Sequence, residues 1–170
     1  MIDEVIMIDI MVDEGISHAD LPDDARMRQA VATACAQAGV SCAVTLCLRM
    51  AGDDVVHDLN RQWRHEDAVT DVLSFPMQDT DFHFDESLGD IILAWPFVER
   101  EASRLGLGAC DHALHLIVHG VLHLLGHDHA EEVQAKRMQT MESRAMAQLN
   151  LHDPYGKASE KEYGKERANV

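Results

Sequence analysis

The feature that most constrains this chain is a group of histidines set in an apolar, helix-forming segment. His119 and His123 are four residues apart, so on a helix of about 3.6 residues per turn they lie on the same face. Gly126 follows them and can leave helical geometry without the penalty of a Cβ, which allows the chain to fold back and deliver His129. Three imidazoles that converge in this way predict a metal site.

Three nitrogen ligands leave a fourth position open on a tetrahedral zinc ion, which is typical of catalytic rather than structural zinc sites. We therefore expect one zinc ion per chain, bound by His119, His123 and His129. The alternative is a buried helix whose histidines only hydrogen-bond to each other. His127 either competes as a ligand or points to water, and His115, one turn before His119, is expected to be a satisfied core histidine.

The histidine segment, about residues 109–125, is apolar on all sides, which predicts a buried central helix. It is too short to cross a bilayer, where its histidines would also be costly. The start of the chain lacks the basic residues of a signal peptide, so we expect a cytoplasmic protein that does not bind membranes.

Charge and cysteine content exclude further classes. The net charge of −16 argues against a protein that follows nucleic-acid backbones by a general positive field, so any RNA-binding basic patch must be local. No paired CxxC spacing is present, and we expect the four cysteines to be reduced core residues: Cys35, Cys42, Cys47 and Cys110.

The rest of the chain combines period-two strands with amphipathic helices. Strands are expected at 5–12, 44–50 and 88–95, and a further strand in the stretch 59–76. Helices are expected from Pro22 to Gly39, at 53–64 with Val56, Leu59 and Trp63 facing inward, from Pro96 to about Gly106, and after Glu131. Residues 78–87 read as an acidic loop. This order implies an α+β fold in which a small mixed four-stranded sheet packs with about five helices around the buried histidine helix.

Residues 157–170 are polar and have almost nothing apolar to bury. They cannot offset the entropy of ordering, so the sequence predicts a single domain over residues 1–156 and a disordered tail. We expect truncation after Gly156 to leave the melting temperature nearly unchanged. Thermal unfolding of both chain lengths measures this, and a large drop on truncation would show that the segment docks.

Two separate motifs resemble the YbeY family of bacterial zinc-dependent endoribonucleases and rRNA maturation factors. The first is the histidine stretch 119–129, and the second includes Leu59-Asn60, Trp63-Arg64, Asp67 and Thr70-Asp71-Val72-Leu73-Ser74-Phe75-Pro76. Shorter matches are Leu88-Gly89-Asp90-Ile91, Met141-Glu142 and Asp153-Pro154-Tyr155. The similarity covers about residues 1–156. His127 and Trp63 stand where the family usually has tyrosine, which leaves all three expected ligands in place.

The resemblance implies zinc on His119, His123 and His129, and an arginine, Arg64, that is needed for activity on RNA. We therefore expect Arg64 and His119 to be the catalytic residues. It also implies cleavage of single-stranded RNA, maturation of the 3′ end of small-subunit rRNA and ribosome quality control. The implied partners are a small-subunit ribosomal protein and the GTPase Era.

Two other functions remain open. His123-x-x-Gly126-x-x-His129 matches the second half of a zinc peptidase motif, but that motif needs a glutamate as general base directly after its first histidine, where this chain has Gly120. The other alternative is a non-enzymatic ribosome assembly factor whose zinc only holds the fold. Measured turnover on RNA separates it from an enzyme.

Overall fold

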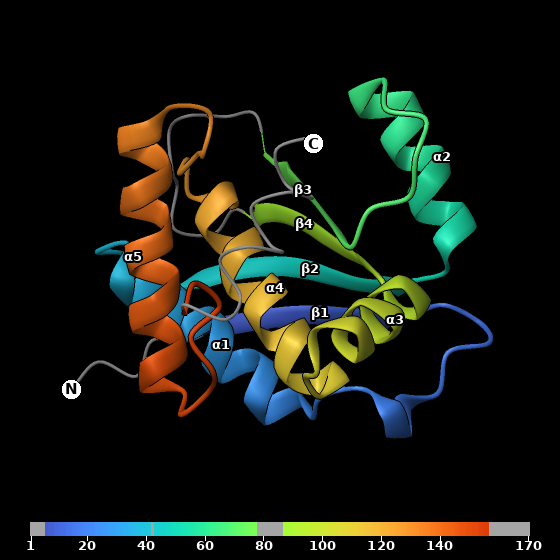
Figure 1. Cartoon of the computed structure of the whole chain (residues 1–170), viewed down its shortest axis with the longest axis horizontal. Coiled ribbons are helices and arrows are strands. Elements are labelled where there is room, and N and C mark those ends of the chain that lie inside the picture. Colours follow the sequence, from blue (N-terminus) through green and yellow to red (C-terminus); the bar gives the residue numbers. More distant parts are fainter. Residues whose placement is uncertain (1–5, 42, 78–86, 157–170) are drawn as a thin grey trace.

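The structure, a computed structural model, describes residues 6–41, 43–77 and 87–156. Within these residues the chain has the α+β fold expected from the sequence (Figure 1). The strands are β1 (Ile6–Val12), β2 (Val44–Ala51), β3 (Val72–Pro76) and β4 (Ser87–Ala94). The helices are η1 (His18–Asp20), α1 (Asp24–Gln37), α2 (Asp53–Arg64), α3 (Trp95–Leu105), α4 (Ala109–Leu124) and α5 (Glu132–Gln148). The expected tail, Cys42 and the expected loop, apart from its last residue, lie outside the described residues.

The four strands form one mixed sheet in the order β1-β2-β4-β3. β1 is parallel to β2 and β2 is parallel to β4, whereas β3 pairs antiparallel with β4. The alternation expected in β1 is confirmed, because Ile6, Ile8 and Ile10 pack on the core while the residues between them are exposed. The antiparallel pairing sets Ser74 opposite Ile91 and so places β3 beside the central strand.

Helix α4 is the central helix of the fold, as the sequence predicted. It packs against α1, α3 and α5 and against strands β3 and β4, and nearly all of it from His112 to Leu124 is buried. Figure 1 shows α1, α4 and α5 together along the sheet, whereas α2 lies apart from them. Among the described residues no single helix is long and apolar enough to cross a membrane; α3 and α4 reach that length and composition only together, with a bend of 112° between them.

The second half of strand β4, residues 91–94, is buried on both faces, which explains why this half is continuously apolar rather than alternating. Ile91 and Leu93 belong to the main core with α1 and α4. Ile92 and Ala94 belong to a second core that includes Val56 of α2. This second core holds α2 against the sheet, and the C-terminal end of α2 borders the candidate site.

Two expectations about side chains are wrong. Trp63 has the helical spacing of a buried residue, yet it is 64% exposed, because the second core packs Leu59 but ends before the last turn of α2. The cysteines are core residues only in part: Cys35 is buried, whereas Cys47 and Cys110 are partly exposed. Cys47 lies on the face of β2 opposite the main core, and its partial burial raises the pKa of its thiol.

Gly89 allows β3 and β4 to approach closely. Its φ is 138°, and a Cβ there would lie 2.2 Å from the carbonyl oxygen of Phe75 and 2.9 Å from Cα of Pro76. Because both atoms belong to the backbone, neither can move without distorting the sheet, and we expect Gly89→Ala to lower the free energy of unfolding by about 1–3 kcal/mol. Thermal unfolding measures the loss. The control is Gly106→Ala, at φ 71° with nothing within 4 Å of its Cβ; equal melting temperatures for the two variants would contradict the clash.

Candidate functional site

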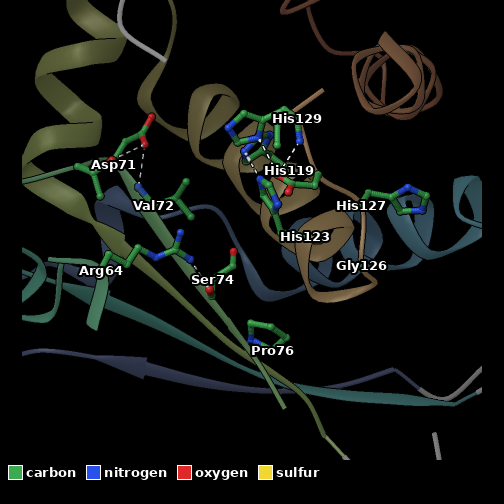
Figure 2. A pocket seen from close by; sticks show the side chains of 13 residues that line it. Arg64, Asp71, Val72, Ser74, Pro76, His119, His123, Gly126, His127 and His129 are labelled. Carbon is green, nitrogen blue, oxygen red and sulfur yellow. Dashed lines mark hydrogen bonds and ion pairs between the residues drawn. The ribbon is translucent and has the colours of Figure 1, made fainter. Parts of the chain in front are cut away.

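A pocket of about 680 Å³ opens at the C-terminal end of α4. One side carries His119, His123 and His129, from α4 and the segment after it. The other side is formed by β3, the residues just before it and Arg64 at the end of α2. Figure 2 shows the three histidines gathered together, and Arg64 reaching along β3 toward Ser74. The fold therefore brings together residues from two motifs that are far apart in the sequence.

The three histidines point toward a common centre. The Nε2 atoms of His119 and His123 are 3.0 Å apart, and one nitrogen from each of the three rings lies within 4.8 Å of the others. His119 is buried, His123 is half-buried, and the side chain of His129 is 39% exposed. The cluster thus extends from the core to the solvent, and the three residues could hold a metal ion that water can reach.

Gly126 ends α4 and turns the chain back, as the sequence predicted. Its φ is 95°, a value that favours glycine. The turn has both hydrogen bonds of a Schellman motif, from His127 N to Leu122 O and from Gly126 N to His123 O, each 3.0 Å. This reversal places the ring of His129 beside that of His123, with 5.1 Å between their centroids.

Glu142 of α5 lies behind His119 and is 1% exposed. Its Oε1 accepts hydrogen bonds from Nδ1 of His119 (2.7 Å) and Nε2 of His115 (3.0 Å), and its Oε2 accepts one from the hydroxyl of Tyr155 (2.6 Å). Burial alone would raise the pKa of Glu142, but the charge of His119 and the hydrogen bonds from both histidines outweigh burial and hold this pKa well below its ordinary value. Since a carboxylate oxygen accepts this bond, the proton lies on Nδ1 of His119, and the neutral form of the ring presents an unprotonated Nε2 to the cluster.

The donor set fits a zinc ion. Zinc–nitrogen bonds of about 2.0–2.1 Å in tetrahedral geometry place two ring nitrogens roughly 3.3 Å apart, close to the 3.0 Å between the Nε2 atoms of His119 and His123. Without a metal, one of these two nitrogens can donate a hydrogen bond to the other, and a zinc ion bound by both would take the place of that proton. Imidazole is also a preferred zinc ligand, and three of them leave a fourth position for water.

Arg64 is held at the pocket by two contacts of its guanidinium group. Nη2 donates to the carbonyl oxygen of Ser74 at 2.7 Å, and Cζ lies 5.8 Å from the centre of the Phe75 ring, an attractive cation–π arrangement. Arginine has five N–H donors in a planar fork. One bond to Ser74 therefore orients the group and leaves donors for a phosphate.

The segment between α2 and β3 is fixed by its own hydrogen bonds. His65 ends α2 in the left-handed region, with φ of 58°. The buried side chain of Asn60 donates to Ala68 O at 2.9 Å, which holds the segment against the helix. Asp71 then caps the start of β3 by accepting from Val72 N at 2.8 Å. These bonds set the position of the end of α2 relative to β3. They therefore give a structural reason for several residues of the motif between residues 59 and 76.

The charge around the pocket is mixed. Arg64 is the only lysine or arginine among the described residues that line it, and Asp71 and Asp128 line it as well. The sequence predicted a local basic patch at any RNA-binding site. Among the described lining residues of this pocket, that patch consists of one arginine. A bound divalent cation would supply most of the positive charge there.

The structure separates three other candidates from the cluster. His115 is a buried histidine bonded to Glu142, which confirms the expectation of a satisfied core residue. His127 lines the pocket, but Figure 2 shows its ring pointing away from the clustered histidines. Arg61 pairs with Asp58 on the exposed face of α2 at 3.0 Å and is absent from the described residues that line the pocket.

The sequence assigned no role to Glu142. A signal was present, because Glu142 is a carboxylate on the apolar stripe of α5 that includes Met138, Met141 and Ala145. A buried acid needs hydrogen-bond donors. Its donors come from α4 and from the segment after α5, and helical periodicity does not show such contacts.

Comparisons with known proteins place the chain in one family. The family model of endoribonuclease YbeY matches residues 14–150. A relative named endoribonuclease YbeY in Rhizorhabdus wittichii is 49% identical over 116 residues, covering 64% of this chain and 69% of the relative. Another with that name in Pseudomonas putida is 39% identical over 140 residues, covering 82% and 88%. A Thermotoga maritima protein solved in solution shares the fold, with a TM-score of 0.53, 24% identity, and coverage of 89% of this chain and 99% of that one.

Proposed function

Because the chain belongs to the endoribonuclease YbeY family, we propose that it is a zinc-dependent endoribonuclease that cleaves single-stranded RNA. Its proposed role is maturation of the 3′ end of small-subunit rRNA and ribosome quality control in the cytoplasm, with a small-subunit ribosomal protein and the GTPase Era as partners. The observation that carries the enzymatic proposal is the convergence of three histidines and one oriented arginine on a single pocket.

The proposed ligands of one zinc ion are His119, His123 and His129, and the proposed catalytic residues are Arg64 and His119. When bound, zinc supplies a water with a pKa of about 7 and a Lewis acid for a phosphoryl oxygen. The proposed work of Arg64 is to hold the phosphate, because a guanidinium can bind two phosphate oxygens at once. Its contact with Ser74 orients it before RNA arrives, so little reorganisation is needed as negative charge develops.

The peptidase alternative lacks a general base. A Cβ at Gly120 would lie 3.1 Å from Ile91 Cδ1, Ile91 Cγ2 and Ser74 Oγ, so α4 packs directly on the sheet at this position. A glutamate side chain has no room there. We therefore favour RNA over peptide as the substrate.

Turnover with purified, zinc-loaded protein tests the proposed function. The substrates are a single-stranded RNA, the same RNA in a duplex, and casein. We expect cleavage of the single strand, loss of cleavage after chelation and recovery on adding zinc. Cleavage of casein would favour the peptidase, and a zinc-bound protein that cuts neither RNA nor casein would favour the non-enzymatic assembly factor.

Zinc binding should depend on pH. Only a neutral imidazole can coordinate, so protons compete with the metal, and we expect zinc to leave as the pH falls through about 6. A colorimetric zinc reporter measures release as the pH is lowered, and circular dichroism at each pH separates release from unfolding. Zinc retention that does not change with pH down to the point where the protein unfolds would contradict histidine ligation.

A further inference from the structure

The carboxylate of Glu142 is the buried group that connects the proposed zinc site to the core. It lies among apolar residues of α5, where an acid without partners would be strongly destabilising. Instead one oxygen faces the rings of His119 and His115, and the other faces the hydroxyl of Tyr155. All three donors thus converge on one side chain that does not itself line the pocket.

The two oxygens of Glu142 have different tasks. At Oε1 the bond to His119 is the shorter, 2.7 Å, and it uses the ring nitrogen that faces away from the histidine cluster. The opposite nitrogen, Nε2, lies 3.0 Å from Nε2 of His123. A histidine whose far nitrogen donates to a carboxylate is fixed in tautomer and orientation, and its ligating nitrogen becomes more basic.

We propose that Glu142 is a positioning residue that fixes His119 as the Nδ1–H tautomer, aims its Nε2 at the cluster and thereby raises the affinity of the site for a divalent cation. This inference rests on the proposed zinc site, and it adds to that site a residue that lies outside the pocket. Glu142 is absent from the described residues that line the pocket, and its contact with the site is the hydrogen bond to His119, so it acts through His119.

Tyr155 fixes the rotation of this carboxylate. The chain after α5 is turned back by Asn150, at φ 58°, with a bond from Leu151 N to Met146 O of 2.9 Å. Asp153 then accepts from Ser143 Oγ at 2.8 Å and from Tyr155 N at 3.0 Å, which ties the segment to α5. The hydroxyl of Tyr155 is thereby placed 2.6 Å from Oε2 of Glu142.

Zinc affinity of the full chain, measured by competition with a chromogenic chelator, tests the proposal. Glu142→Gln keeps the shape of the side chain: its amide oxygen can accept from the histidines and its amide nitrogen can donate to the Tyr155 hydroxyl, but the charge is lost. We expect Glu142→Gln to bind zinc about 10- to 100-fold more weakly than the parent does. For Tyr155→Phe, which keeps the carboxylate, we expect affinity to fall by at least about threefold. The control is Glu132→Gln, the same change on the same helix at a side chain that is 86% exposed, and it should match the parent.

A second readout separates positioning from a purely structural role. Nitrogen-15 NMR of the zinc-free proteins reports which ring nitrogen of His119 carries the proton, and melting temperatures report folding. We expect Nδ1–H in the parent and a smaller share of it in Glu142→Gln, because a neutral amide oxygen accepts a weaker hydrogen bond than a carboxylate and the amide can also turn its NH2 group toward the ring. If Glu142→Gln does not fold, Tyr155→Phe decides by the same two measurements.

The outcomes for the site and for this residue are distinct. A parent chain that binds no zinc would overturn the proposed zinc site together with the role of Glu142. A parent that binds zinc, with folded Glu142→Gln and Tyr155→Phe variants within about twofold of its affinity, would overturn the role of Glu142 alone.

Discussion

Arg64→Ala is expected to lower the rate of RNA cleavage by about a hundredfold to a thousandfold while zinc content and melting temperature stay unchanged. The loss would follow from removing the one oriented charge that is proposed to hold the phosphate. Arg64→Lys should recover only part of the rate, because an ammonium group cannot form the two-pronged contact of a guanidinium. Initial rates on a labelled single-stranded RNA measure both effects.

The control for Arg64 lies on the same helix. Arg61→Ala removes an arginine whose side chain is 61% exposed and pairs with Asp58 rather than lining the pocket. We expect it to change the cleavage rate little. Equal losses for Arg61→Ala and Arg64→Ala would show that the effect comes from the overall charge of α2 and not from the position of Arg64.

His123→Ala is expected to reduce zinc from one ion per chain to almost none and to abolish cleavage with it. Losing a direct ligand should weaken binding by more than the roughly 10- to 100-fold that the loss of an outer partner costs. Elemental analysis after dialysis against a weak chelator measures the zinc content. We expect this loss because Nε2 of His123 lies 3.0 Å from Nε2 of His119, where one ion could bind both nitrogens.

His127→Ala is the matched control for this loss. His127 lies in the same turn, but its ring points away from the other three (Figure 2). We expect this variant to keep one zinc ion. A His123→Ala protein with full zinc would contradict the ligand assignment. If His127→Ala lost zinc and His123→Ala did not, His127 would be the ligand in place of His123.

The elements around the histidines could be predicted from the sequence because their signals are local. The apolar segment of α4 and the spacing of His119 and His123 depend only on helical periodicity, and Gly126 marks the turn by its own conformational freedom. The same holds for the alternation in β1 and the bounds of α2. In each case neighbours in the sequence determine the result.

The side chains that were misplaced or missed depend on contacts between distant elements. Trp63 has the spacing of an inward residue, but whether the last turn of α2 is covered depends on the extent of the sheet beneath it. Glu142 is explained only when α4, α5 and the segment after α5 are assembled around it. Periodicity shows which face of a helix is apolar but does not show which partner that face meets.

The most direct test of the central claim is a comparison of the parent with Arg64→Ala and His119→Ala proteins, purified identically and incubated with the same single-stranded RNA. We expect only the parent to cut at full rate, with one zinc ion in the parent and in Arg64→Ala and almost none in His119→Ala. If all three proteins cut the RNA equally, the activity belongs to a contaminant, and the chain is not the endoribonuclease proposed.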